Sequence, residues 1–173
     1  HIPKSGGSTF HTVLGKRYNS YETHNVLGSR AGDSEISEFI NMKQDQKSKI
    51  TLLKGHMPFG LHKHLSDRFE YITFLRNPVE RVISQYFYIK KNKNNPKHKE
   101  VHMGGMNIQE FVTSGIVTGM NNGHCRFLTG DIDRLKYSDT SNLLEDTLTN
   151  IEKYFLLVGI TERFDESILV LSH

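Results

Sequence analysis

A glycine-rich turn near the start of the sequence carries the clearest chemistry in the chain. Residues 3–9 read Pro-Lys-Ser-Gly-Gly-Ser-Thr, and residues 10–14 can begin a helix. Such a turn offers backbone N–H groups, hydroxyls and a lysine to one anion, and the helix dipole adds to the attraction. The Walker A pattern ends in Gly-Lys-Ser/Thr, whereas Lys4 precedes the glycines. The turn therefore indicates a phosphate-type cradle distinct from Walker A, with an ordinary glycine turn as the plainer alternative.

A second candidate lies where the apolar residues 71–75 end in Arg76. A magnesium-dependent nucleotide hydrolase commonly places an aspartate at the end of such a strand. A guanidinium suits direct, forked recognition of a phosphate instead. Ser84, two turns into the helix that follows, can add a hydroxyl if the helix leans over the same anion, although such a serine on its own is usually a surface residue.

These side chains need a scaffold of alternating strands and helices. Apolar runs predict buried strands at 50–53, 71–75 and 154–158, with residues 1–2 as the end of a fourth. The clearest helix begins with Asn77 as cap and Pro78 as first residue. Further helices are predicted at 34–42, 107–113, 141–153 and 163–171. The alternation predicts an α/β fold with a largely parallel sheet, whose ligands bind beyond the carboxyl ends of the strands.

Composition limits the class of protein. A chain of 173 residues, 36% hydrophobic and 24% charged, fits one domain over residues 1–173. A net charge of +3 favours a localised anion over a nucleic acid as ligand. Cys125 is the single cysteine, which excludes an intrachain disulfide and a multi-cysteine zinc site. No carboxylate cluster suggests a metal, and no apolar run approaches the roughly twenty residues that cross a bilayer.

The two motifs together resemble the sulfotransferases that use 3′-phosphoadenosine-5′-phosphosulfate (PAPS) as co-substrate. The resemblance is greatest to the carbohydrate branch, which includes the heparan and chondroitin uronyl 2-O-sulfotransferases and their bacterial relatives. It implies a P-loop NTPase-like three-layer fold with a central, mostly parallel sheet flanked by helices. It also implies that Arg76 and Ser84 bind the 3′-phosphate. The implied ligands of the 5′-phosphosulfate are Lys4, Ser5, Gly6, Gly7, Ser8 and Thr9.

Two further segments carry the resemblance. Residues 54–60 contain a Gly-His element whose histidine, His56, is the implied catalytic base. Residues 121–130 resemble a family segment in which Arg126 would contact the donor, although His124 and Cys125 depart from its usual pattern. Residues 158–164 resemble the family's late turn from strand to helix.

The implied reaction depends on alignment and charge stabilisation rather than on covalent chemistry. Lys4 would neutralise charge on the bridging oxygen, and His56 would take the proton of the acceptor hydroxyl. No metal is required. A plainer role for His56 is a hydrogen bond within a turn, and His62 and His64 are nearby competitors that we expect to be solvent-exposed.

Several alternatives remain open from the sequence. The chain could be a P-loop phosphotransferase that needs ATP and magnesium, a non-catalytic module that holds nucleotide or acidic glycan, or a structural protein. The implied acceptor is a carbohydrate or another hydroxyl-bearing molecule. The lysine-rich residues 90–99, with His98 and His102 close by, suit a polyanionic acceptor or form a solvated loop.

The compartment and the extent of the domain are also expectations. The lone cysteine favours a bacterial-type cytoplasmic enzyme, whereas a Golgi or membrane-anchored location requires an anchor before His1. We expect part of the sheet or of the acceptor site to lie outside the sequence at both ends.

Overall fold

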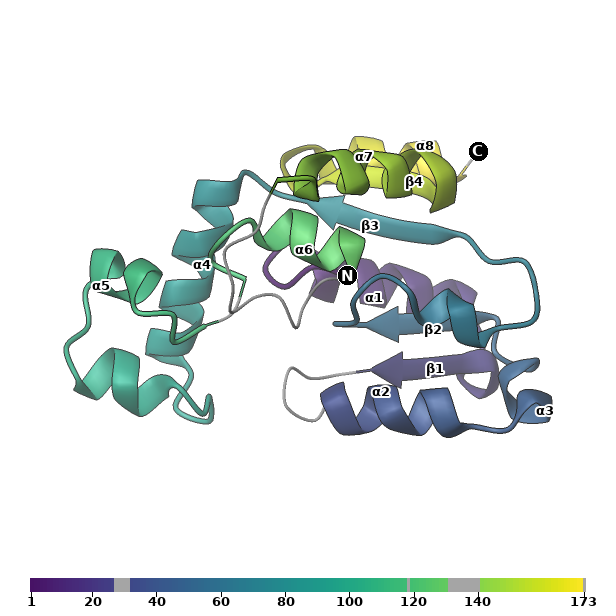
Figure 1. Ribbon diagram of the computed structural model, residues 1–173, viewed down its shortest axis with the longest axis horizontal. Helices are drawn as coiled ribbons and strands as arrows, with labels where there is room; N and C mark the ends of the chain where they lie inside the picture. Colours follow the sequence, from purple (N-terminus) through teal and green to yellow (C-terminus); the bar gives the residue numbers. More distant parts are fainter. Residues whose placement is uncertain (27–31, 118, 131–140, 173) are drawn as a thin grey trace.

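The computed structural model describes residues 1–26, 32–117, 119–130 and 141–172 (Figure 1). The strands are β1 (Thr23–Val26), β2 (Leu52–Gly55), β3 (Tyr71–Leu75) and β4 (Phe155–Ile160). The helices are α1 (Gly7–Arg17), α2 (Gly32–Asn41), α3 (Gln44–Lys47), α4 (Pro78–Lys91), α5 (Ile108–Thr113), α6 (Gly123–Thr129), α7 (Leu143–Tyr154) and α8 (Phe164–Ser172). Short helical turns are η1 (Ser20–Glu22), η2 (Leu61–His64), η3 (Lys99–Met103) and η5 (Thr161–Arg163). The mixed α/β organisation predicted from the sequence is confirmed.

The strands form two parallel pairs. β1 pairs with β2, and β3 pairs with β4, with a register shift between Tyr71 and Ile72. The first residues of the chain lie beside β2, because the backbone nitrogen of His1 donates to the carbonyl of Gly55 and Ile2 is buried. A cavity of about 370 Å³ is lined by β2, β3 and these first residues. Residues 1–2, predicted as the end of a strand, do not form a strand in the structure. They lie beside the end of β2 through the hydrogen bond from the His1 nitrogen to Gly55.

Helices lie on both faces of the strands. Figure 1 shows α1 and α8 behind the strands, with α6 and α7 in front. Phe10 and Leu14 of α1 pack with Phe74 of β3, and Phe164 of α8 joins the same cluster. Each such side chain contributes about 1.5–3 kcal/mol when fully buried, so this cluster fixes α1, and the turn that precedes it, against β3.

A second core belongs to a helical lobe formed by α4, α5 and the turn Lys99–Met103. Tyr86 and Ile89 of α4 pack with Val101 and Phe111. Figure 1 places α5 on the side of α4 that faces away from the strands. One end of α4 therefore adjoins the strands, while the other end belongs to this lobe.

The start of α4 is fixed by local chemistry. The side-chain oxygen of Asn77 accepts hydrogen bonds from the N–H groups of Val79 at 3.0 Å and Glu80 at 3.2 Å. Pro78 occupies the first helical position, where a missing N–H costs nothing. The predicted boundary is confirmed, and it places Arg76 between the end of β3 and the first turn of α4.

One prediction about exposed residues holds only in part, and two were wrong. The lysine-rich segment is not a loop throughout, because Lys90 and Lys91 end α4 and His98 is buried with a ring nitrogen 3.0 Å from the carbonyl oxygen of Ile89. His62 and His64 are half-buried. The His62 ring stacks on Phe69, and its Nδ1 lies 2.8 Å from the Tyr71 hydroxyl.

Candidate functional site

The glycine-rich turn presents several polar groups at the start of α1. Lys4 and Gly6 both have left-handed backbone conformations, with φ of 69° and 75°. A lysine held in this region costs about 1–3 kcal/mol and persists only where the surrounding structure imposes it. Gly6 precedes α1, and no side chain in the described ranges caps that helix. The exposed Ser8 and Thr9 lie in its first turn.

Two smaller features fit an anion at this turn. The side chain of Ser5 is fully buried, and its Oγ has no hydrogen-bond partner among the described residues. A buried hydroxyl without a partner costs about 1–3 kcal/mol, which an incoming acceptor or donor group would relieve. Gly7 leaves room for the His1 ring, because an added Cβ would lie 1.8 Å from Nε2 of His1.

The two predicted motifs meet in the structure. Nη1 of Arg76 donates to the backbone carbonyl of Lys4 at 3.4 Å, across 72 residues of sequence. The Lys4 ammonium lies 4.2 Å from the ring centre of Tyr88, on α4. The turn thus contacts both the end of β3 and the helix that follows it, which brings two cations to one place.

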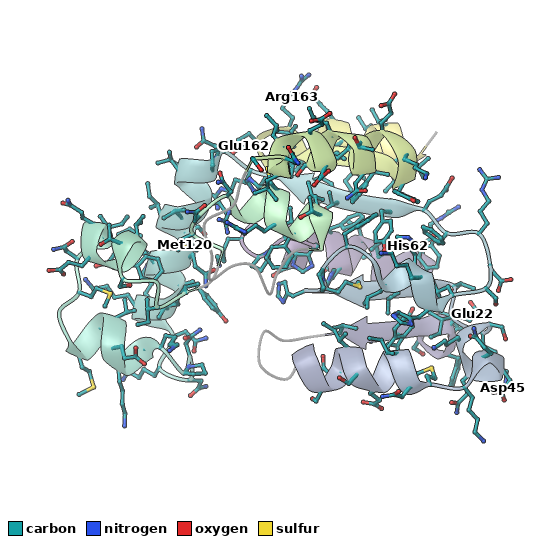
Figure 2. The ribbon with its side chains drawn as sticks, viewed as in Figure 1. Glu22, Asp45, His62, Met120, Glu162 and Arg163 are labelled. Carbon is teal, nitrogen blue, oxygen red and sulfur yellow. The ribbon has the colours of Figure 1, made fainter. Side chains whose placement is uncertain are left out.

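Among the described residues, carboxylates lie beside Arg76 and at the start of α4. Nη2 of Arg76 lies 3.7 Å from the Glu80 carboxylate, and both side chains are partly exposed, so an anionic ligand can compete for the guanidinium. Burial, with a smaller contribution from Arg76, holds the pKa of Lys4 below its ordinary value. The backbone N–H of Asn77 donates to Glu162 at 2.8 Å and holds the pKa of that carboxyl below its usual range. Figure 2 shows Glu162 near the start of α4.

His56 lies directly after β2, at the strand end predicted from the sequence. Its backbone N–H donates to the carbonyl of Val26 at 2.9 Å. Its ring centre lies 4.2 Å from that of His1, whose ring packs edge-on against His11 at 4.5 Å. Burial lowers the pKa of His11 to about 4, so this neighbour is neutral at neutral pH. Because His1 also contacts the start of α1 at Gly7, one imidazole separates His56 from the turn.

The remaining predicted residues differ in their placement. Ser84 is half-buried and lies one helical turn before Tyr88, on the face of α4 that Lys4 reaches. Arg126 is only 2% exposed, and its Nε donates to the carbonyl of Asn121 at 3.1 Å. The structure therefore brings together Lys4, Arg76 and the face of α4 that carries Ser84, while the Arg126 side chain is buried and donates to Asn121.

Comparison with known proteins gives the family. The model of the sulfotransferase family matches residues 1–157. The chain belongs to the sulfotransferase family. The matched range includes the turn, His56, Arg76, Ser84 and Arg126, so sulfuryl transfer is the general reaction of this protein. No curated protein matches the chain.

Two negative findings concern the described part of this sulfotransferase. None of its described helices is long and apolar enough to cross a membrane. Within the same residues, no group of three or more His, Cys, Asp or Glu side chains could hold a metal ion.

Sequence reasoning overlooked a pair of basic side chains beside the site, of which Arg81 is buried and His124 is half-buried. Arg81, on α4, is buried and donates through Nη2 to the carbonyl of Gly119, and burial lowers its pKa. Burial, followed by the charge of Arg81, lowers the pKa of His124 to about 4, while Glu162 opposes the shift. The available signal was the departure of His124 from the family pattern, but no sequence spacing connects it with Arg81.

We expect His124 to make this sulfotransferase less stable in mild acid. The folded-state pKa of about 4 lies below the ordinary 6.5, so protonation favours the unfolded chain. The stability that the neutral His124 imidazole contributes is fully present above pH 6.5 and is lost progressively as the pH falls towards 4. The free energy of unfolding would be measured in urea near neutral pH and in mild acid. Between the two pH values it should fall by about 1 kcal/mol less in His124→Gln than in the wild type, after allowing for partial solvent exposure. His64→Gln is the control. An equal fall in the free energy of unfolding in His124→Gln and in the wild type would contradict the prediction.

Proposed function

We propose that this sulfotransferase moves a sulfuryl group from PAPS to a hydroxyl of a carbohydrate acceptor. The observation that carries the proposal is the contact between the two motifs, in which Arg76 donates to the Lys4 carbonyl and the Lys4 ammonium reaches α4. A donor with phosphates at both its 5′ and 3′ positions needs two cationic groups that belong to one continuous surface.

The described residues fit such a donor. The proposed ligands of the 5′-phosphosulfate are Lys4, Ser5, Gly6, Gly7, Ser8 and Thr9, in a turn with an uncapped helix start and a buried hydroxyl that lacks a partner among the described residues. Arg76 and Ser84 are the proposed ligands of the 3′-phosphate, with the guanidinium exchanging its weak contact to Glu80 for the ligand. Arg126 is a further proposed ligand of the donor, with a buried side chain whose Nε donates to the carbonyl of Asn121.

The proposed mechanism divides the work between Lys4 and His56. Lys4 supplies positive charge to the bridging oxygen of the donor, where negative charge grows as the bond to sulfur breaks. His56 accepts the proton of the attacking hydroxyl, since a neutral imidazole suits proton transfer near neutral pH. These roles require no metal.

The proposed fold is the P-loop NTPase-like three-layer arrangement. The two parallel strand pairs, with α1 and α8 on one face and α6 and α7 on the other, support it. For the acceptor, the lysines around the end of α4 suit an anionic glycan, since Lys91 and Lys93 are both exposed there.

A transfer assay tests the proposal. The protein would be incubated with PAPS and a panel of neutral and uronic-acid-containing oligosaccharides, with and without magnesium, and products read by mass spectrometry. We expect addition of one sulfuryl group without magnesium, and loss of that product in His56→Ala. Transfer of phosphate from ATP, or the absence of any sulfated product, would contradict the proposal.

A further inference from the structure

Tyr88 lies outside the family motifs and contacts Lys4, a proposed catalytic group. Its ring centre lies 4.2 Å from the Lys4 ammonium, within the distance of about 6 Å over which a cation is attracted to an aromatic face. The residue is 45% exposed, so its ring does not belong to the buried core of the helical lobe. Core packing alone does not account for the position of this half-exposed ring over the Lys4 ammonium.

The ring and the ammonium are each held by their own surroundings. The left-handed backbone of Lys4 sets the direction in which its side chain leaves the turn. Nδ2 of Asn92 donates to the Tyr88 hydroxyl at 3.1 Å and fixes the outer end of the ring. Each partner of the contact is therefore restrained by a second feature of its own surroundings.

The position of the ring also relates to Ser84. Residues four apart on a helix lie on the same face, so Ser84 and Tyr88 lie one turn apart on the face that Lys4 reaches. Arg76, which precedes the same helix, donates to the Lys4 carbonyl. Arg76 thus holds the backbone of Lys4, while the Lys4 side chain extends to the face of α4 that carries Ser84 and Tyr88.

We propose that Tyr88 is a positioning residue that holds the Lys4 ammonium over α4, so that the cation is oriented before the donor binds. Its role in turnover rests on the proposed function, whereas the contact itself does not. A lysine has four flexible carbon–carbon bonds and loses considerable rotamer freedom when it is ordered. A ring that restricts the ammonium beforehand lowers this cost at the moment of reaction.

The contact can be tested without turnover by competitive acylation of lysines. A limiting amount of an amine-reactive ester would be added near neutral pH, and the labelling of Lys4 relative to the exposed Lys16 measured by peptide mass spectrometry. The ring covers the amine and shields it from the reagent, so Tyr88→Ala should raise the Lys4 to Lys16 ratio by about threefold or more. Tyr88→Phe keeps the ring and should stay near the wild-type ratio.

Phe87→Ala is the matched control, because Phe87 is the preceding residue of α4, is 47% exposed and packs edge-on against Tyr86. It should leave the ratio unchanged. An unchanged ratio in Tyr88→Ala, or an equal rise in Phe87→Ala, would overturn the inference. Circular dichroism would confirm that all three variants fold.

Kinetics separates this inference from the proposed function. We expect Tyr88→Ala to lower kcat for sulfuryl transfer about tenfold, with a smaller change in the KM for PAPS, and Tyr88→Phe to recover most of the rate. An active wild type with an equally fast Tyr88→Ala would overturn the positioning role alone. An inactive wild type would count against the proposed function, and the labelling ratio would still decide whether Tyr88 holds Lys4.

Discussion

His56→Ala is expected to lower kcat by about 10²–10⁴-fold while leaving the affinity for 3′-phosphoadenosine-5′-phosphate (PAP), the product nucleotide, unchanged. The reason is that His56 lies after β2, with His1 between its ring and the start of α1, so its removal deletes a base without disturbing the anion turn. Steady-state kinetics with PAPS and an active acceptor would give kcat, and calorimetry would give the affinity for PAP.

His64→Ala is the control for this prediction, since His64 follows in the short turn Leu61–His64. It should retain wild-type kcat. If His56→Ala kept the wild-type rate, or if it lost PAP binding together with the rate, His56 would have a structural role rather than the role of a base.

Lys4→Met is expected to lower kcat by about 10²–10³-fold, the range seen when one group that stabilises transition-state charge is removed. The methionine fills similar space but cannot neutralise charge on the bridging oxygen. Single-turnover measurements with saturating PAPS would isolate this step from donor binding. Binding of PAP should weaken much less than kcat falls, because the turn retains its backbone amides and hydroxyls.

Lys16→Met, at the exposed end of α1, is the matched control for loss of a positive charge. It should behave as the wild type. Equal losses in kcat and in PAP affinity for Lys4→Met would show that Lys4 acts through binding alone.

The start of α4 shows why part of the site could be predicted from the sequence. An apolar strand, an arginine, an asparagine cap and a proline each specify the backbone within a few residues, so the position of Arg76 follows from local chemistry. The same holds for the anion turn, where glycines and the following helix determine the geometry. Family resemblance then supplied the expectation that the two belong together, and the Arg76 to Lys4 contact brings them together in the structure.

Other features depend on contacts between distant segments. β1 reads Thr-His-Asn-Val and has no apolar run, so only its pairing with β2 makes it a strand. Burial of His62 arises from Phe69, Tyr71 and Tyr154, which come from the turn before β3, from β3 and from α7. The polar sequence around His62 predicted a solvent-exposed side chain, but three aromatic residues from other segments pack against its ring.

The placement of the Arg126 side chain does not follow from its motif. Its segment resembles the family pattern, and in the structure the side chain is buried and its Nε donates to the carbonyl of Asn121. The Tyr88 ring over Lys4 is a second such case, since 84 residues of sequence separate the two and no spacing rule connects them. Both placements follow from tertiary packing, to which local sequence patterns give no access.

The most direct test of the donor site is calorimetric titration with PAP, with and without magnesium, beside ATP as comparator. Arg76→Ala would be measured in parallel, with Arg68→Ala as control, because Arg68 precedes β3 and is almost fully exposed. We expect PAP to bind without magnesium and more tightly than ATP, and Arg76→Ala to weaken it by at least about tenfold, as for loss of a charged hydrogen bond. Preference for ATP with magnesium, or PAP binding that is unchanged in Arg76→Ala, would contradict the assignment of this site to PAPS.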